Sequence, residues 1–122
     1  MRLRFIALLA LVAALAVSGV AAASTQHSTV LPIKITVTLH DYSFHFSRVS
    51  VPKGSTVIFT VKNAGAVQHN MDFTSLNRRT AILSPGGKAT MKVIFKKKGT
   101  IQVVCDVPRH IQLGMVSSFK VK

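Results

Sequence analysis

From position 33 onward, hydrophobic and polar residues alternate along most of the chain. Over residues 33–39 every second side chain is aliphatic, and the residues between are lysine or threonine. A period of two is typical of a β-strand with one buried face and one exposed face. The same alternation recurs over residues 42–46, 49–51, 57–61, 91–95, 101–105 and 119–121. We therefore predict a series of short strands.

Glycine and proline residues separate these strands. Turn sequences occupy residues 52–55, 63–65, 84–87 and 98–99. Residues 74–82 are the least regular stretch, and we expect a short helical turn or a loop there. No segment after residue 24 has the sustained 3.6-residue period of an amphipathic helix. Short strands spaced at roughly 8–12 residues, with such turns between them, predict an all-β sandwich or barrel.

The N-terminal segment follows a different pattern. Arg2 and Arg4 precede an apolar run over residues 5–20, and small residues follow at 21–24. This order predicts a cleavable signal peptide over residues 1–23, and therefore an exported protein in the periplasm or outside the cell. The alternative is a retained membrane anchor, because about 18–20 apolar residues can span a bilayer. We expect residues 24–32 to form a flexible arm and residues 33–122 a single domain.

The charge of the chain is strongly positive. Sixteen lysine and arginine residues face three acidic residues, which gives a formal net charge of +13. Nucleic-acid binding is disfavoured because the basic residues are not interleaved with aromatic residues for stacking and because the protein is exported. The surplus favours acidic protein partners or peripheral contact with an anionic membrane surface. We expect a monomer.

Cys105 is the only cysteine, so the exported domain cannot form an internal disulfide. It shares the inward face of its strand with Val103, while His110 and Met115 follow at five-residue intervals in the next loop. Thiolate and imidazole bind copper and zinc, whereas a thioether prefers copper. A structural zinc site would need more firm ligands. One cysteine, two histidines and a weak axial methionine form the ligand set of blue-copper sites.

The spacing leaves the second histidine open among four candidates. His27 lies in the expected flexible arm, and His45 lies on the outward face of its strand. His40 ends the first strand. His69 follows the turn at residues 63–65 and begins another apolar stretch.

His69-Asn70, followed by Cys105-x4-His110-x4-Met115, resembles the cupredoxins, the family of plastocyanin, azurin and pseudoazurin. The resemblance implies an eight-stranded Greek-key sandwich with one copper ion buried at one end. It implies that His69, Cys105, His110 and Met115 bind the copper, and that His110 is partly exposed. It also implies that the Asn70 amide donates to the cysteine sulfur and that its side chain ties the two ligand loops together.

The resemblance further implies a type 1 copper protein that carries single electrons and is not an enzyme. Multicopper oxidases and copper nitrite reductases need additional copper sites and longer chains. One departure is Arg109, which stands where the family often has glycine before the second histidine. Two alternatives remain: a copper carrier or sequestration protein, and a metal-free binding module with a cupredoxin-like fold.

Overall fold

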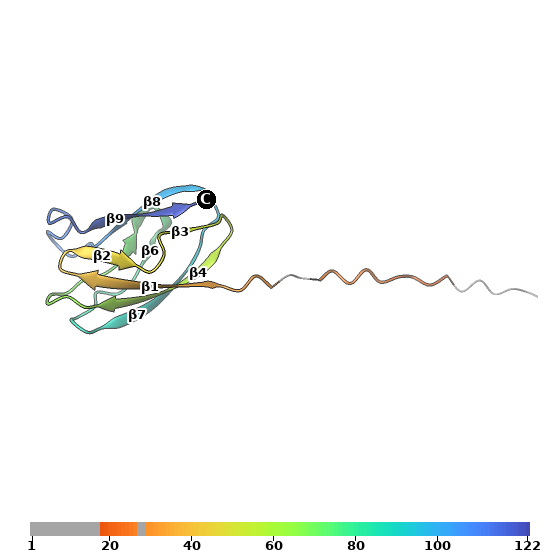
Figure 1. The fold of residues 1–122 in the computed structure, drawn as a ribbon, viewed down its shortest axis with the longest axis horizontal. Helices are drawn as coiled ribbons and strands as arrows, with labels where there is room; N and C mark the ends of the chain where they lie inside the picture. The colour runs from red at the N-terminus through yellow and green to blue at the C-terminus, as the bar shows by residue number, and fades with distance from the viewer. Residues whose placement is uncertain (1–17, 27–28) are drawn as a thin grey trace, which may run out of the picture.

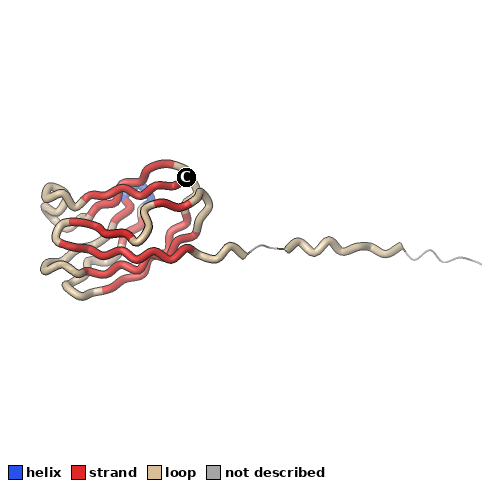
Figure 2. The backbone as a smooth tube through the Cα atoms, viewed as in Figure 1, coloured by secondary structure: helices blue, strands red, loops and turns tan. Residues whose placement is uncertain are grey.

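The computed structural model describes residues 18–26 and 29–122, and residues 33–122 form a sandwich of two β-sheets (Figures 1 and 2). One sheet has the strand order β2-β1-β4-β7, and the other has the order β3-β9-β8-β5-β6. The first sheet comprises β1 Ile33–His40, β2 Ser43–Phe46, β4 Thr56–Asn63 and β7 Lys88–Ile94. The second comprises β3 Ser50–Val51, β5 Asp72–Phe73, β6 Arg78–Arg79, β8 Gly99–Val104 and β9 Val116–Val121. The predicted all-β class is confirmed.

Both sheets are mixed. Strand β1 pairs in parallel with β4 and antiparallel with β2, while β3 pairs in parallel with β9. The other pairings among β4, β5, β6, β7, β8 and β9 are antiparallel. The described part thus contains nine strands where eight were expected, and three of them, β3, β5 and β6, are only two residues long.

The sandwich has two ends with different loops. At the loop end, β1, β4 and β8 finish, and residues 105–115 connect β8 to β9. At the far end, β1 begins and β9 finishes, as Figure 1 shows beside the C-terminus. The chain therefore enters the domain at the far end.

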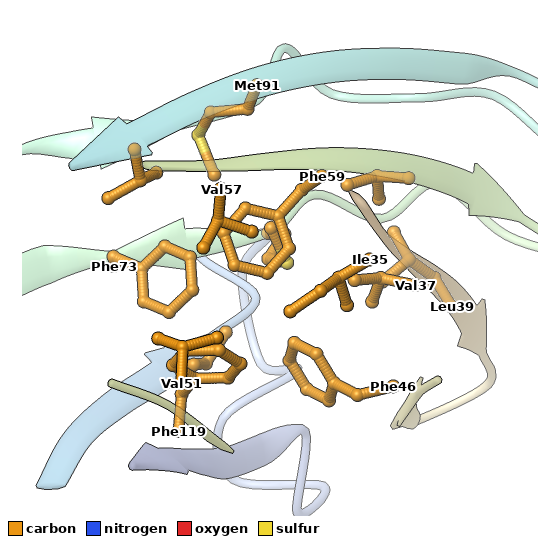
Figure 3. Close-up of a cluster of buried hydrophobic side chains, with 14 of the residues drawn as sticks. Ile35, Val37, Leu39, Phe46, Val51, Val57, Phe59, Phe73, Met91 and Phe119 are labelled. Atoms are coloured by element: carbon orange, nitrogen blue, oxygen red, sulfur yellow. The ribbon is translucent and has the colours of Figure 1, made fainter. Parts of the chain in front are cut away.

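The core lies between the sheets and contains aromatic side chains at its centre (Figure 3). Four phenylalanine rings contact one another there, with centroids 5.1 to 6.2 Å apart: Phe59, Phe73, Phe95 and Phe119. Such pairs add about 0.5–1.5 kcal/mol each to the stabilisation from burial. They join β4 to β5 and β9 across the two layers, so both sheets support the loops at either end.

The predicted inward faces are buried over most of the domain. Ile35, Val37 and Leu39 of β1 are at most 1% exposed, as the alternation predicts. Val49 differs, because it precedes β3 and is 56% exposed whereas Val51 is buried. The irregular stretch contains the 3-10 helix η1, Thr74–Leu76, in agreement with the expected helical turn or loop, and the short strand β6, which was not expected.

Residues 18–26 and 29–32 form neither helix nor strand. Most of the predicted signal peptide over 1–23 lies outside the described residues, so its cleavage stays a prediction. Within the described ranges, no helix has the length and apolar character needed to cross a membrane.

Candidate metal centre

Three of the predicted ligands converge at the loop end. The ligand atoms of His69, Cys105 and His110 all lie within 4.8 Å of one another, and all three residues are buried. The two Nδ1 atoms are 3.1 Å apart, and the cysteine Sγ lies 3.4 Å from His110 Nδ1 and 4.0 Å from His69 Nδ1. Each imidazole therefore presents the same ring nitrogen to the thiol.

The loop from Cys105 to Met115 is closed by its own backbone. Cys105 N donates to the carbonyl of Met115, and Met115 N donates to the carbonyl of His110. The Met115 side chain is fully buried in the core cluster that also contains Cys105. A thiol, an imidazole and a thioether are thus held at one end of the core by a short loop with little freedom.

His69 reaches the site from a separate loop and not from a strand. Its backbone forms an isolated β-bridge with Leu83, in which each residue donates to the other's carbonyl. Asn63, the last residue of β4, holds this loop because its side-chain amide donates to the carbonyls of Val67 and Leu83. Its side-chain oxygen accepts from Gly65 N, so the buried amide is fully bonded.

Asn70 joins the two loops at the sulfur. Its backbone N–H donates to Cys105 Sγ at 3.4 Å, and its side-chain oxygen accepts from Asp106 N at 2.9 Å. This donor helps to fix the position of the sulfur, which binds metal as the thiolate. Asn70 lies where the family resemblance implies it.

Asp41 was absent from the sequence prediction and yet contacts a ligand directly. Its Oδ1 lies 2.6 Å from His69 Nε2, on the side of the ring opposite Cys105. A carboxylate can only accept here, so Nε2 carries the proton and Nδ1 offers its lone pair to the site. The pKa of Asp41 is lowered below its ordinary value of 3.8, chiefly because Ala66 N donates to it and then because His69 does.

Gly65 provides the space for this pair. A Cβ atom at this position would overlap Asp41 Oδ1 and would lie 2.8 Å from His69 Nε2. Any side chain would therefore displace the carboxylate or the ring. The sequence predicted a turn at residues 63–65 but not this contact.

Tyr42 covers both imidazoles. Its ring meets His110 edge to face at 4.9 Å and His69 at 5.9 Å. His110 was expected to be partly exposed, but it is only 7% exposed. This burial, together with the neighbouring His69, lowers the pKa of His110 below its ordinary 6.5, and so favours the neutral ring that binds metal.

Two of the other candidate histidines lie away from the site. His40 ends β1 and His45 lies on β2, and both are exposed, whereas His27 is outside the described residues. Asp41 had one visible signal in the sequence: it is one of only three acids, and it directly follows the strand that ends beside the site.

The donor set suits a copper ion. Metal bonds of about 2.0–2.3 Å to imidazole and thiolate would separate the donors by distances of the size observed. Two imidazoles and one thiolate form a trigonal set, and a buried methionine is the typical weak axial ligand of such a set. His69, Cys105, His110 and Met115 thus form a type 1 copper-like site.

Comparison with known proteins supports this assignment. The family model described as a cupredoxin-like domain matches residues 6–116. The chain belongs to this family. Comparison with curated protein sequences gave no significant match.

Solved structures share the cupredoxin fold with this chain. Dithionite-reduced auracyanin from the photosynthetic bacterium Roseiflexus castenholzii is 24% identical, with a TM-score of 0.59 over 75% of this chain and 96% of its own. Auracyanin B is 18% identical, with a TM-score of 0.59 over 73% and 88% of the two chains. A chain of a heme-copper terminal oxidase dimer is 20% identical, with a TM-score of 0.61 over 80% and 68%. At these identities the similarity establishes the fold.

Proposed function

We propose that this cupredoxin is an exported type 1 copper protein that carries single electrons between redox partners. The observation that carries the proposal is the convergence of His69 Nδ1, Cys105 Sγ and His110 Nδ1 within 4.8 Å beside a buried methionine. Copper, when bound, supplies a reversible one-electron change. The chain supplies the four ligands and a framework that holds them in place.

Rigidity of the ligands is the protein's main contribution to electron transfer. Asn70 fixes the sulfur, Asp41 fixes the His69 ring, and backbone hydrogen bonds close the loop of Cys105 and His110. A site that moves little between its two oxidation states needs little reorganisation during transfer. Tyr42 and the core exclude water from the donors.

The proposal assigns no enzymatic activity to the site. Catalytic metal sites keep a ligand position open for water or substrate. Here the buried Met115 would supply the fourth ligand, and Tyr42 covers the imidazoles. A carrier of electrons needs no open position.

The surface next to His110 is suited to brief contacts with a partner. Ile111 is 47% exposed and Leu113 is 56% exposed, and both follow His110 in the loop. Redox encounters use small interfaces, below about 1,200 Å² in total. Arg109, exposed beside this apolar pair, would attract an acidic protein and raise its association rate.

Two measurements separate this function from its alternatives. Fast electron self-exchange between the Cu(I) and Cu(II) proteins is expected for an electron carrier, whereas a copper carrier would exchange electrons slowly and release copper readily to a chelator. A protein that acquired no colour with Cu(II) would be a metal-free module.

The position of the partner is tested separately, with Arg109→Glu. This change should slow reduction by an acidic redox protein without changing the visible spectrum, and an unchanged rate at low salt would exclude this docking position.

A further inference from the structure

The far end of the sandwich is built from segments that are distant in sequence. Lys53 N donates to the carbonyl of Lys122, and Gly54 N donates to the carbonyl of Phe95. Gly99 pairs with Val121 where β8 begins and β9 finishes. These bonds bring the turn at 52–55, the turn at 96–98 and the C-terminus together on one surface.

This surface is densely basic. Five lysines are exposed at this end: Lys53, Lys96, Lys97, Lys98 and Lys122. Lys120 of β9 is exposed as well, and it pairs with Thr100, the second residue of β8. We call these six lysines the far-end lysines. No described strand or turn at this end contributes an acidic side chain.

The three acids of the chain all lie near the loop end and are already engaged. Asp41 is bonded to His69, and Asp106 forms an ion pair with Arg79 at 3.1 Å. Asp72 is buried, pairs with Val104 at the end of β8, and accepts from Thr74. The positive charge of the far end is therefore not neutralised from within the domain, and the molecule is electrostatically polarised along its length.

A partly apolar pocket opens among the far-end lysines. It has a volume of about 440 Å³, and its walls include Leu76, Ile94 and Ile101 as well as Lys96, Lys97 and Lys98. Ile94 is 49% exposed there. Ammonium groups around an apolar floor suit a ligand with an anionic head and an apolar portion.

We propose that the far end docks on an anionic membrane surface, with the far-end lysines contacting lipid phosphates. A lipid surface matches both features, because its headgroups are anionic and its outer acyl region is apolar. A lipid surface is also broad enough to contact lysines that are spread over several turns, whereas a compact protein partner would contact only some of them. An acidic redox protein is the weaker fit, since it must approach His110 at the opposite end of the molecule.

The path of the chain agrees with this orientation. The chain enters β1 at Ile33 on the far end, and the apolar run at residues 5–20 precedes it. Whether or not that run is retained, docking through the far end would direct His110 and its apolar neighbours away from the membrane. The proposal rests on the far-end lysines and the apolar pocket among them, and it does not depend on copper binding.

The test measures binding to lipid vesicles with protein that begins at Ser24. Residues 33–122 contain all strands and the whole buried core of the described part, so this protein keeps the complete domain. Beginning at Ser24 removes the apolar run, which would itself partition into vesicles. Vesicles of phosphatidylglycerol mixed with phosphatidylcholine are compared with phosphatidylcholine alone, at low and high salt.

The decisive variant is Lys96→Glu, Lys97→Glu, Lys98→Glu. Each lysine at an anionic surface contributes on the order of a fivefold gain in binding, so the triple variant should bind at least about a hundredfold more weakly. The matched control reverses Lys62, Lys88 and Arg109, which are exposed at the loop end. The control has the same net charge and should lose far less binding.

The proposal predicts that the wild type binds only to the vesicles that contain phosphatidylglycerol and that high salt weakens this binding. The Lys96, Lys97 and Lys98 triple variant should lose the binding, whereas the control should retain most of it. Equal loss in both variants would mean that only net charge matters and would overturn the assignment of a docking surface. Absence of wild-type binding would overturn it as well. If soluble polyglutamate bound through the same lysines while vesicles did not, the surface would serve an acidic protein instead.

Discussion

Asp41 Oδ1 lies 2.6 Å from Nε2 of His69, so a carboxylate orients one of the two imidazoles of the copper-like site. The same carboxylate accepts from Ala66 N, and Gly65 leaves the room that both groups need. A short hydrogen bond from a ligand imidazole to a carboxylate fixes the tautomer and increases the basicity of the ligand nitrogen. The negative charge also favours Cu(II) over Cu(I).

Replacing Asp41 should therefore weaken the site without unfolding the protein. We expect Asp41→Ala to reduce the affinity for Cu(II) by about 10–100-fold, the usual effect of losing such a partner. Asp41→Asn keeps an acceptor oxygen but removes the charge, so it should mainly raise the reduction potential. Affinity for redox-inert Zn²⁺, measured by calorimetry, gives a readout that does not depend on electron transfer.

Asp106→Asn is the matched control for this prediction. It removes the same charge from the residue after Cys105, but its carboxylate pairs with Arg79 at the surface and touches no ligand. We expect metal affinity close to wild type. Equal losses in the Asp41 and Asp106 variants would show that the effect is one of overall charge and not of His69 orientation.

Arg109 has a backbone conformation that suits glycine. Its φ is 72°, in the left-handed region that a side chain makes unfavourable by about 1–2 kcal/mol. This explains why the family often has glycine here. Arg109→Gly should raise the free energy of unfolding by roughly 0.5–1 kcal/mol, after allowing for the greater entropy of glycine in the unfolded chain.

Thermal or denaturant unfolding of the metal-free protein measures this change. The control is Arg78→Gly in β6, because Arg78 is also exposed but has no positive φ. Glycine should destabilise the protein there, by about 0.5–1 kcal/mol. If both glycine variants were destabilised alike, Arg109 would not be strained.

The fold should tolerate acid well. Acid unfolding acts mainly through carboxylates that are paired in the native state, and this chain has three aspartates and no glutamate. Asp41 has a folded pKa below its ordinary 3.8. Its stabilising contribution is therefore present above about pH 4 and is lost only as the pH falls through the lowered value.

His110 acts in a higher pH range. Its folded pKa lies below 6.5, so the unfolded chain binds a proton first and the metal-free protein loses some stability as the pH falls below 6.5. One histidine should not unfold the domain. Circular dichroism of the metal-free protein should retain its β signal from about pH 7 to about pH 4, and a cooperative unfolding transition inside this range would contradict the prediction.

The sequence contained enough information for the fold class and the core faces because strand burial repeats every second residue. Ile35, Val37 and Leu39 show this directly. Val49 breaks the rule, since it precedes a strand of only two residues and no neighbouring layer covers it. The four ligand positions followed from donor chemistry and family spacing.

Contacts between loops could not be predicted in the same way. Asp41 and His69 are 28 residues apart, and their contact depends on β1 and β4 running in parallel and finishing at the same end. Alternation along a strand does not specify which strands are neighbours. Tyr42 follows β1 and His110 lies between β8 and β9 of the other sheet, so the low exposure of that imidazole depends on how the two sheets pack.

The measurement that tests the central claim most directly is the visible absorption spectrum after addition of Cu(II), for wild type and Cys105→Ser. A thiolate bound to Cu(II) gives an intense charge-transfer band and a blue colour, and metal binding displaces the thiol proton. Wild type should turn blue with one equivalent of copper, while Cys105→Ser should remain folded and colourless. A blue serine variant, or a wild type that binds copper without the band, would contradict the assignment of Cys105 as a ligand in a type 1 site.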